Sequence, residues 1–392
     1  MQTAIASWDQ GRAWPADVGR LDSESTLVLA FGASECVDRP EGLEQLRAAF
    51  PRGHVVGCST SGQIRGDSVR DEGIDALIIR FEHARVRVAS SRVDGEGGSL
   101  GAGRALGEAL HAADLRGVFV LSDGTRSNGT QLCAGLSSVL GAGTPVTGGL
   151  AGDGPRFQRT WVCCDSAPCQ GLVAAVGLYG DESVAMWHGC KDGWDAFGPE
   201  RVVTRSCGNV LYELDGEPAL GVYERYLGGH AADLPASALL FPLSLRRRGS
   251  GSLLVRTVLG VSREEKSMTF AGDIPQGSTV QLMRADFDRI IDGASGAANM
   301  LPLDLMSGAT AACVPINCVG RRLILKHRAE EELEEVVNLL APGVPSVGFY
   351  SYGEISPLAG SPCELHNQTM TLAVFAEQAG GCDAPDARKA AA

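Results

Sequence analysis

The sequence lacks long hydrophobic runs, since no uninterrupted apolar segment reaches about 18 residues, the length with which an α-helix crosses a bilayer. Residues 1–14 also show no basic segment followed by an apolar block, which is the pattern of a secretory signal. Both absences lead us to expect a cytoplasmic protein without a membrane partner.

Clustered basic residues are scarce as well. The chain has 34 Lys and Arg residues against 47 Asp and Glu residues, which gives a formal net charge of −13. A nucleic-acid-binding surface needs clustered positive side chains to contact phosphates, and here only Arg246–Arg248 form a short basic run. We therefore expect no nucleic-acid partner.

Motifs for metals and nucleotides are missing too. No two of the twelve cysteines are separated by two residues, as zinc knuckles and thioredoxin motifs require. Because the cysteines are spread over a long chain that lacks an export signal, we expect reduced thiols. No Gly-x-x-x-x-Gly-Lys-Ser/Thr phosphate loop is present, and Gly101, Gly103 and Gly107 miss the spacing of a dinucleotide loop by one residue. These absences argue against structural zinc, nucleotide hydrolysis and nicotinamide or flavin binding.

What the sequence does contain is an alternation of apolar strand-like runs and amphipathic helical segments. In chain order these are a run at 27–31, a helix at 40–50, a run at 55–57, a helix at 100–112, a run at 118–121 and a helix at 129–140. Such alternation is typical of layered α/β domains. We predict a mixed α/β fold with mixed parallel and antiparallel sheets flanked by helices.

The length of 392 residues predicts two domains, at roughly 150 residues per domain. The turn-rich segment Gly193–Pro199 marks the boundary, so we predict domains at 1–192 and 193–380, and a disordered tail at 381–392 that is rich in Ala. Within the second domain, the apolar residues of 333–340 lie on one helical face opposite a run of glutamates. We expect those glutamates to be solvated.

Two polar segments near the C-terminal end concentrate acid, imidazole, amide and hydroxyl groups. They span 348–355 and 363–369 and lie between apolar strand-like runs. Burying such groups is costly unless they bond to one another or to a ligand. The pattern predicts a ligand site with four residues, namely Tyr352, Glu354, Glu364 and Asn367.

Two of the seven histidines differ from the others, which stand in polar or element-end contexts. His188 ends an apolar strand before a glycine-rich turn, so its ring could project into a cleft between domains. His366 lies between Glu364 and Asn367, and a neighbouring carboxylate or amide could fix its tautomer for metal or ligand binding. For both histidines a structural role stays open.

A strand-end turn with the sequence Gly-Cys-Ser-Thr-Ser-Gly spans residues 57–62. It resembles a nucleophile elbow, but Ser61 occupies a position that the Gly-x-Ser-x-Gly motif requires as glycine. We therefore interpret Ser59, Thr60 and Ser61 as residues of a turn that lines a ligand, in preference to a hydrolase site.

Five segments in a fixed order resemble the FIST sensory family, in which a FIST N domain precedes a FIST C domain. They are 57–62, the glycine-rich segment 148–154, 208–216, 318–322, and the pair formed by 353–354 and 366–369. The resemblance covers nearly the whole chain. It implies a small-molecule sensor and not an enzyme, with amino acids as the suggested ligand class. It also adds Gly148, Gly149 and Asp153 to the expected ligand-binding residues.

The resemblance further implies a partner. Free-standing bacterial FIST proteins must signal to a separate output protein, and some, of the NosP type, are haem proteins that sense nitric oxide. These regulate a histidine kinase of a two-component system and through it biofilm or cyclic-di-GMP output. On this basis our leading hypothesis is a haem-binding nitric oxide sensor. Since no Cys-x-x-Cys-His site exists, the haem would be held noncovalently through His188 or His366.

The alternative hypothesis is a haem-free module that senses an amino acid or another small metabolite. Glu354 and Asp215 would bind the amino group, while Arg321 or the backbone amides of 148–152 would hold the carboxylate. A third hypothesis, a hydrolase, would depend on Ser59 or Ser61. The oligomeric state is left open, a homo-oligomer included.

Overall fold

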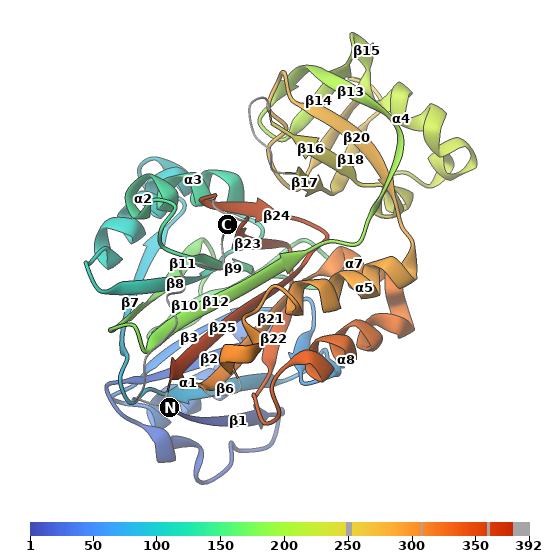
Figure 1. Cartoon of the computed structure of the whole chain (residues 1–392). Helices are drawn as coiled ribbons and strands as arrows, with labels where there is room; N and C mark the ends of the chain where they lie inside the picture. Colours follow the sequence, from blue (N-terminus) through green and yellow to red (C-terminus); the bar gives the residue numbers. More distant parts are fainter. Residues whose placement is uncertain (248–252, 307–308, 359–360, 379–392) are drawn as a thin grey trace.

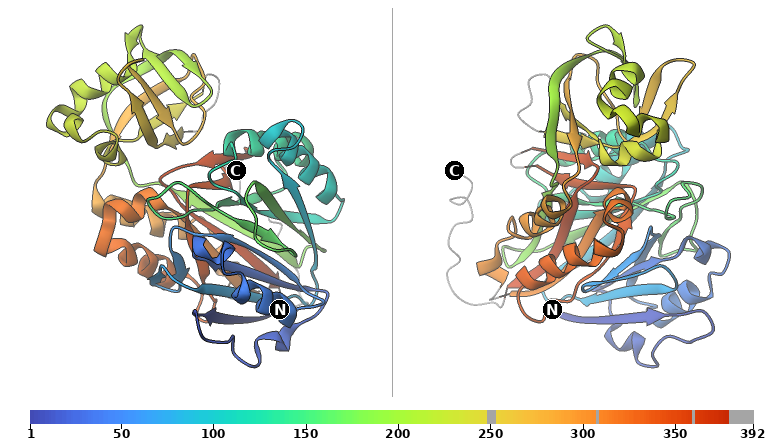
Figure 2. Two further views of the ribbon diagram at one scale, coloured as in Figure 1. Left: turned by 180° about the vertical axis from the view of Figure 1, so that it is seen from behind. Right: turned by 90° about the vertical axis from the view of Figure 1, so that its right-hand side faces the viewer.

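A computed structural model describes residues 1–247, 253–306, 309–358 and 361–378 (Figure 1). The elements form a body of three sheets with flanking helices and a smaller β-rich domain that projects from it (Figures 1 and 2). The predicted mixed α/β fold, with parallel and antiparallel strand pairs in the same sheets, is confirmed.

The first sheet is built from the N-terminal part of the chain. Its order is β1 (Gln2–Trp8), β6 (Ile74–Arg80), β2 (Thr26–Gly32), β3 (His54–Ser59) and β10 (Val162–Cys164). β2 and β3 pair in parallel, joined through η2 (Ser34–Val37) and α1 (Glu41–Ala49). Every residue of β2 is buried, as expected for an apolar run with both faces covered.

The second sheet combines both parts of the chain. Its order is β24 (Cys363–His366), β23 (Gly353–Pro357), β9 (Val146–Leu150), β8 (Leu115–Ser122), β11 (Leu172–Tyr179) and β7 (Arg85–Arg92). The helices α2 (Gly98–Leu110) and α3 (Gly129–Leu140) pack on one face of it. Strands β23 and β24, from the C-terminal part of the chain, thus extend a sheet whose other strands come from the N-terminal half.

The third sheet also combines both parts of the chain, because strands of the N-terminal half extend the strands of the C-terminal half. Its order is β12 (Val184–Lys191), β25 (Met370–Gln378), β21 (Ala309–Cys318), β22 (Val347–Ser351), β4 (Gln63–Arg65) and β5 (Ser68–Arg70). β21 and β22 pair in parallel, joined by α7 (Val319–Leu325), η5 (Lys326–Arg328) and α8 (Ala329–Leu339), and α5 (Phe287–Ala298) also packs here. Phe31 and Phe349 stack between the first and third sheets with ring centroids 4.9 Å apart.

The smaller domain has its own hydrophobic core. Its strands are β13 (Asp195–Cys207), β14 (Val210–Leu214), β15 (Glu217–Pro218), β16 (Leu243–Arg246), β17 (Leu253–Arg256), β18 (Val258–Ser262), β19 (Ser267–Phe270) and β20 (Thr279–Arg284). They are joined by α4 (Ala219–Leu227), η3 (Gly228–Asp233) and η4 (Ala236–Leu240). The chain leaves the body after β12 and returns to it at α5 (Figure 1).

Two short elements complete the body, η1 (Val18–Leu21) and α6 (Leu303–Met306). Within the described ranges, no helix is long and apolar enough to cross a membrane. The turn-rich segment at 193–199 lies where the chain enters the smaller domain, while the division into domains at 1–192 and 193–380 stays a prediction. The tail predicted at 381–392 lies outside the described residues.

Candidate functional site

A cavity of about 1210 Å³ lies at the carboxyl ends of parallel strands from the first and third sheets. Ligands of open α/β sheets commonly bind at such ends. The wall is formed by Trp8, Asp9, Gln10, Ala33, Ser34, Glu35, Cys36, Asp38, Arg39, Thr60, Ser61, Gly62, Asp71, Glu72, Gly73, Asp153, Gly154, Pro155, Arg156, Val319, Arg322, Leu323 and Lys326. The site therefore requires both halves of the chain.

The turn after β3 forms one side of the cavity. Thr60 Oγ1 accepts a hydrogen bond from the Gly62 amide at 3.2 Å, and Ser61 Oγ accepts one from the Gly154 amide at 3.0 Å. A Cβ atom on Gly152 would lie 2.2 Å from Ser61 Oγ, so this approach requires glycine. Two motifs singled out in the sequence thus lie side by side, and Thr60, Ser61 and Asp153 line the cavity.

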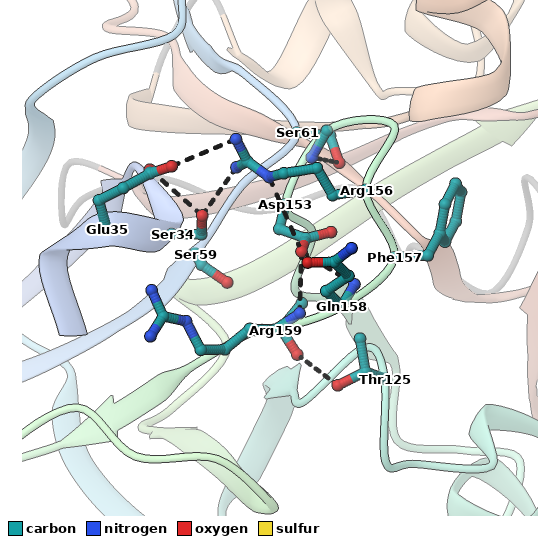
Figure 3. Close-up of polar contacts among 12 residues, drawn as sticks. Ser34, Glu35, Ser59, Ser61, Thr125, Asp153, Arg156, Phe157, Gln158 and Arg159 are labelled. Carbon is teal, nitrogen blue, oxygen red and sulfur yellow. Dashed lines mark hydrogen bonds and ion pairs between the residues drawn. The ribbon is translucent and has the colours of Figure 1, made fainter. Parts of the chain in front are cut away.

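The loop that begins at Asp153 is ordered by its own carboxylate (Figure 3). Asp153 Oδ2 accepts hydrogen bonds from the amides of Gln158 at 3.0 Å and Arg159 at 2.8 Å, and Oδ1 accepts one from the Tyr352 hydroxyl. Phe157 stacks on Tyr352 with ring centroids 4.3 Å apart. Burial raises the pKa of the Tyr352 phenol above its ordinary value, so the hydroxyl stays protonated well into the alkaline range.

Arg156 projects from the same loop toward η2. Its Nη2 donates to Ser34 Oγ at 2.7 Å, and its Nη1 lies 3.2 Å from Glu35 Oε1 (Figure 3). The loop is therefore tied to the residues that follow β2. It closes one side of the cavity, held by η2 of the N-terminal half and by Tyr352 of the C-terminal half.

Arg322 of α7 ties the opposite wall to the N-terminal half. Its guanidinium donates to both carboxylate oxygens of Asp71, at 2.6 and 2.8 Å, and to the Ser61 carbonyl at 2.6 Å. The hydrogen bond from Arg322 lowers the pKa of Asp71. Sequence reasoning missed this residue and selected its neighbour. The spacing of Val319, Arg322, Leu323 and Lys326, all on the cavity wall, is that of one helical face and could have identified it.

Arg321 instead points away from the cavity. It is fully buried, pairs with Glu332 at 2.8 Å and donates to the Ile290 carbonyl at 2.5 Å. The expectation that the glutamates of α8 are all solvated is therefore wrong for Glu332. Its partner lies on a different helix, and the local pattern of α8 contains no sign of it.

The C-terminal polar segments form a sealed cluster of Ser351, Glu354, His366 and Thr369, all buried. Glu354 accepts hydrogen bonds from Ser351 Oγ at 2.5 Å and Thr369 Oγ1 at 3.0 Å. Burial raises the pKa of Glu354 to about 8. Ser351 and Thr369 bond to Glu354, whereas the His366 ring bonds to the Ser356 carbonyl, and none of the four residues lines the cavity.

Two further predicted residues of this region also lie off the cavity wall. Asn367 is buried beside the sealed cluster and donates from Nδ2 to the His366 carbonyl at 3.0 Å. Glu364 forms an ion pair with Arg247 at 2.7 Å. Tyr352 links the C-terminal motif to the cavity through Asp153, and Tyr350 links it through backbone hydrogen bonds with Ser61 and Gly62, each of 2.8 Å.

The remaining predicted residues have other surroundings. Ser59 is buried and its Oγ accepts a hydrogen bond from the Trp161 amide at 3.0 Å. Gly148 and Gly149 lie inside β9, where a Cβ atom would meet Val120 O at 1.9 Å or Ile316 Cγ2 at 2.7 Å. These glycines allow close packing of strands.

Asp215 lies in the turn between β14 and β15 of the smaller domain and pairs with Arg201 at 3.1 Å (Figure 1). Glu354 belongs to β23 in the body. The structure therefore does not bring these two carboxylates together around one amino group.

The two candidate axial histidines lie away from the cavity wall. His366 is 2% exposed, and its Nε2 lies 3.0 Å from the Ser356 carbonyl oxygen. His188 is partly buried on β12, and strand alternation places it on the same face as Met186 and Cys190. Burial lowers the pKa of both imidazoles. Neither residue lines the cavity, so the arrangement does not fit a haem bound there.

Comparison with known proteins places the chain in a family. A family model described as the FIST N domain matches residues 26–217, and one described as the FIST C domain matches residues 219–357. The chain belongs to the FIST family. The FIST domains indicate a sensory role in signal transduction.

Several curated relatives are similar to this FIST protein, and all three that follow are described as uncharacterized. A Mycobacterium bovis protein is 27% identical over 60% of this chain and 61% of its own length. A Mycobacterium tuberculosis protein is 29% identical over 60% of this chain and 62% of its own length. A Methanocaldococcus jannaschii protein is 24% identical over 92% of this chain and 74% of its own length. The matched part thus spans about three fifths of the mycobacterial relatives.

Proposed function

We propose that this FIST protein binds a small polar ligand in the cavity and transmits its occupancy through α7 to the smaller domain, which signals to a separate protein. The observation that carries the proposal is the position of α7. One face of this helix forms the cavity wall, and other residues of the same helix pack against the smaller domain.

The second contact of α7 is a hydrophobic cluster. Ile324 and Leu325 pack in it with Trp194, at the entrance to the smaller domain. The same cluster contains Val255 and Met283, which belong to β17 and β20 of that domain. A displacement of α7 by a ligand would therefore change the packing at the base of the smaller domain, as coupling between two sites requires.

The cavity chemistry favours binding over catalysis. Ser61 Oγ accepts a hydrogen bond from a backbone amide, and no histidine is among the wall residues. An activated serine needs a neighbouring base. Carboxylates, guanidinium groups and backbone amides of the wall suit a ligand that carries charges of both signs, such as an amino acid. This supports the haem-free sensing hypothesis.

A haem-dependent nitric oxide sensor that controls a histidine kinase remains a proposal supported by the resemblance alone. It is checked by titrating the full chain with haemin and following the Soret band. Saturable binding at one haem per chain that is lost in His188→Ala or His366→Ala would favour it over the cavity proposal.

The cavity proposal is tested with a thermal-shift panel of acidic, neutral and basic amino acids, dicarboxylates and polyamines on the full chain. Hydrogen exchange with and without the best compound then shows where the ligand acts. We expect protection at 60–62 and 319–326 together with altered exchange at 253–256 and 279–284. Exchange changes confined to the cavity would contradict transmission to the smaller domain. If no compound of the panel binds, the proposal of a ligand site in the cavity is contradicted.

Arg322→Ala is the matched variant, because it removes the tie between α7 and Asp71. We expect ligand binding to persist while the exchange change in the smaller domain is lost. Arg85→Ala is its control. Arg322 pairs with an aspartate and lies over the Tyr350 ring, and Arg85 likewise pairs with Asp114 and lies over the Tyr179 ring, but outside the cavity. The control should behave as the unmodified chain.

A further inference from the structure

The charged side chains of the cavity wall divide into paired and unpaired groups. Four carboxylates are neutralised by arginines at hydrogen-bond distance, in the pairs Asp9–Arg70, Glu35–Arg156, Asp38–Arg159 and Asp71–Arg322. Asp153 is held by two backbone amides and the Tyr352 hydroxyl. The field of such a pair falls off quickly, so these groups contribute little attraction for a ligand.

Three charged wall residues have no such partner. The side chains of Arg39, Lys326 and Glu72 make no hydrogen bond or ion pair within the described parts of the chain, and all three are exposed. Arg39 follows η2 in the N-terminal half, whereas Lys326 follows α7 in the C-terminal half. The two free cations therefore come from the two walls of the cavity.

We infer that the ligand carries two anionic groups and one cationic group, as an acidic α-amino acid does. One carboxylate would pair with Arg39, the other with Lys326, and the ammonium group with Glu72. The formal excess of carboxylates on the wall would by itself favour a cation, but that excess is cancelled by the pairs described above. A ligand that bridges Arg39 and Lys326 would also draw the N-terminal wall and the end of α7 together.

The inference rests on the proposed function, because it names the ligand class of the same cavity. Isothermal titration of the full chain compares L-glutamate, L-glutamine, glutarate and L-lysine. We expect L-glutamate to bind most tightly, L-glutamine about tenfold more weakly, and L-lysine not measurably. Binding of L-glutamate should weaken as salt is raised, because its partners are exposed charges.

Variants assign the roles of the three residues. Arg39→Gln and Lys326→Gln should each weaken L-glutamate binding about two- to fivefold, the range that exposed ion pairs give. Glu72→Gln should weaken binding of L-glutamate and leave that of glutarate unchanged. Arg104→Gln is the control, since this exposed arginine of α2 has no partner in the described parts and lies outside the cavity.

Two outcomes overturn the inference in different ways. If L-glutamine or L-lysine binds as tightly as L-glutamate, or if the Arg39 and Lys326 variants bind normally, the ligand class is wrong while ligand sensing at the cavity stands. If no compound of the wider thermal-shift panel binds at all, the proposed function fails together with the inference.

Discussion

The cavity and the buried interior of the body both contain carboxylates, hydroxyls and arginines, but these groups have different surroundings in the two regions. In the cavity, Arg322 makes its ion pair with an exposed aspartate, Asp71. In the interior, the adjacent Arg321 pairs with Glu332, and both side chains are fully buried. The difference teaches that polar character alone does not identify a ligand site. A site also needs groups that other residues have not already satisfied and that a ligand can reach.

The two adjacent arginines provide the largest expected contrast. Arg321→Ala leaves the buried carboxylate of Glu332 without its cation, so we expect the free energy of unfolding to fall by about 3–5 kcal/mol. Arg322→Ala removes a partly exposed pair and a hydrogen bond to the Ser61 carbonyl, so it should lower the free energy of unfolding by about 1–2 kcal/mol. Urea denaturation of the two variants measures both values. Equal losses would show that the interior pair is not isolated from solvent in the way its burial indicates.

The acid in the sealed cluster gives the second contrast. Burial raises the pKa of Glu354 from 4.5 to about 8, so the folded chain holds a proton that the unfolded chain releases. The stability contributed by this proton is complete below pH 4.5 and is lost as the pH rises toward 8. Between pH 5.5 and 7.5 the free energy of unfolding should fall by about 2–3 kcal/mol.

Urea denaturation at a series of pH values measures this fall. The same measurement on Glu354→Gln isolates the effect of Glu354, because the amide cannot titrate but keeps the shape of the protonated acid. We expect the variant to lack that part of the pH dependence. Glu334→Gln, an exposed position on α8, is the control and should retain the full slope. A normal slope in Glu354→Gln would show that Glu354 is ionised in the folded chain.

Local patterns were enough to predict much of the fold. The helix at 129–140 begins at Asn128, whose side chain caps it by accepting a hydrogen bond from the Gln131 amide, and it matches α3. The turn at 57–62 was predicted to line a ligand, and Thr60 and Ser61 do line the cavity. Propensity, capping and turn chemistry act over a few residues, so a sequence displays them directly.

Long-range pairings were not predictable in the same way. β23 pairs with β9, and β4 pairs with β22, so each half of the chain completes a sheet of the other. These pairings bring α7 to the cavity and place Glu354 in the interior, and no local pattern encodes them. Sequence reasoning therefore recognised the correct polar segments but could not separate those that face the cavity from those that face each other.

The smallest expected effect lies where the two regions meet. Tyr352 belongs to the C-terminal motif, yet its hydroxyl donates to Asp153 and accepts a hydrogen bond from the Phe157 amide at 3.1 Å. Tyr352→Phe should lower the free energy of unfolding by about 1 kcal/mol, since Asp153 keeps its two backbone donors. Hydrogen exchange at residues 153–159 should quicken, first at the Phe157 amide.

Tyr212→Phe is the matched control for this contact, because the Tyr212 ring lies against Arg205 and its hydroxyl has no hydrogen-bond partner in the described parts of the chain. It should change neither stability nor exchange in the loop. If Tyr352→Phe behaves like this control, the loop is ordered by Asp153 and Arg156 alone. The C-terminal motif would then contact the cavity wall through the backbone hydrogen bonds of Tyr350 with Ser61 and Gly62, and the Tyr352 hydroxyl would add nothing to the order of the loop.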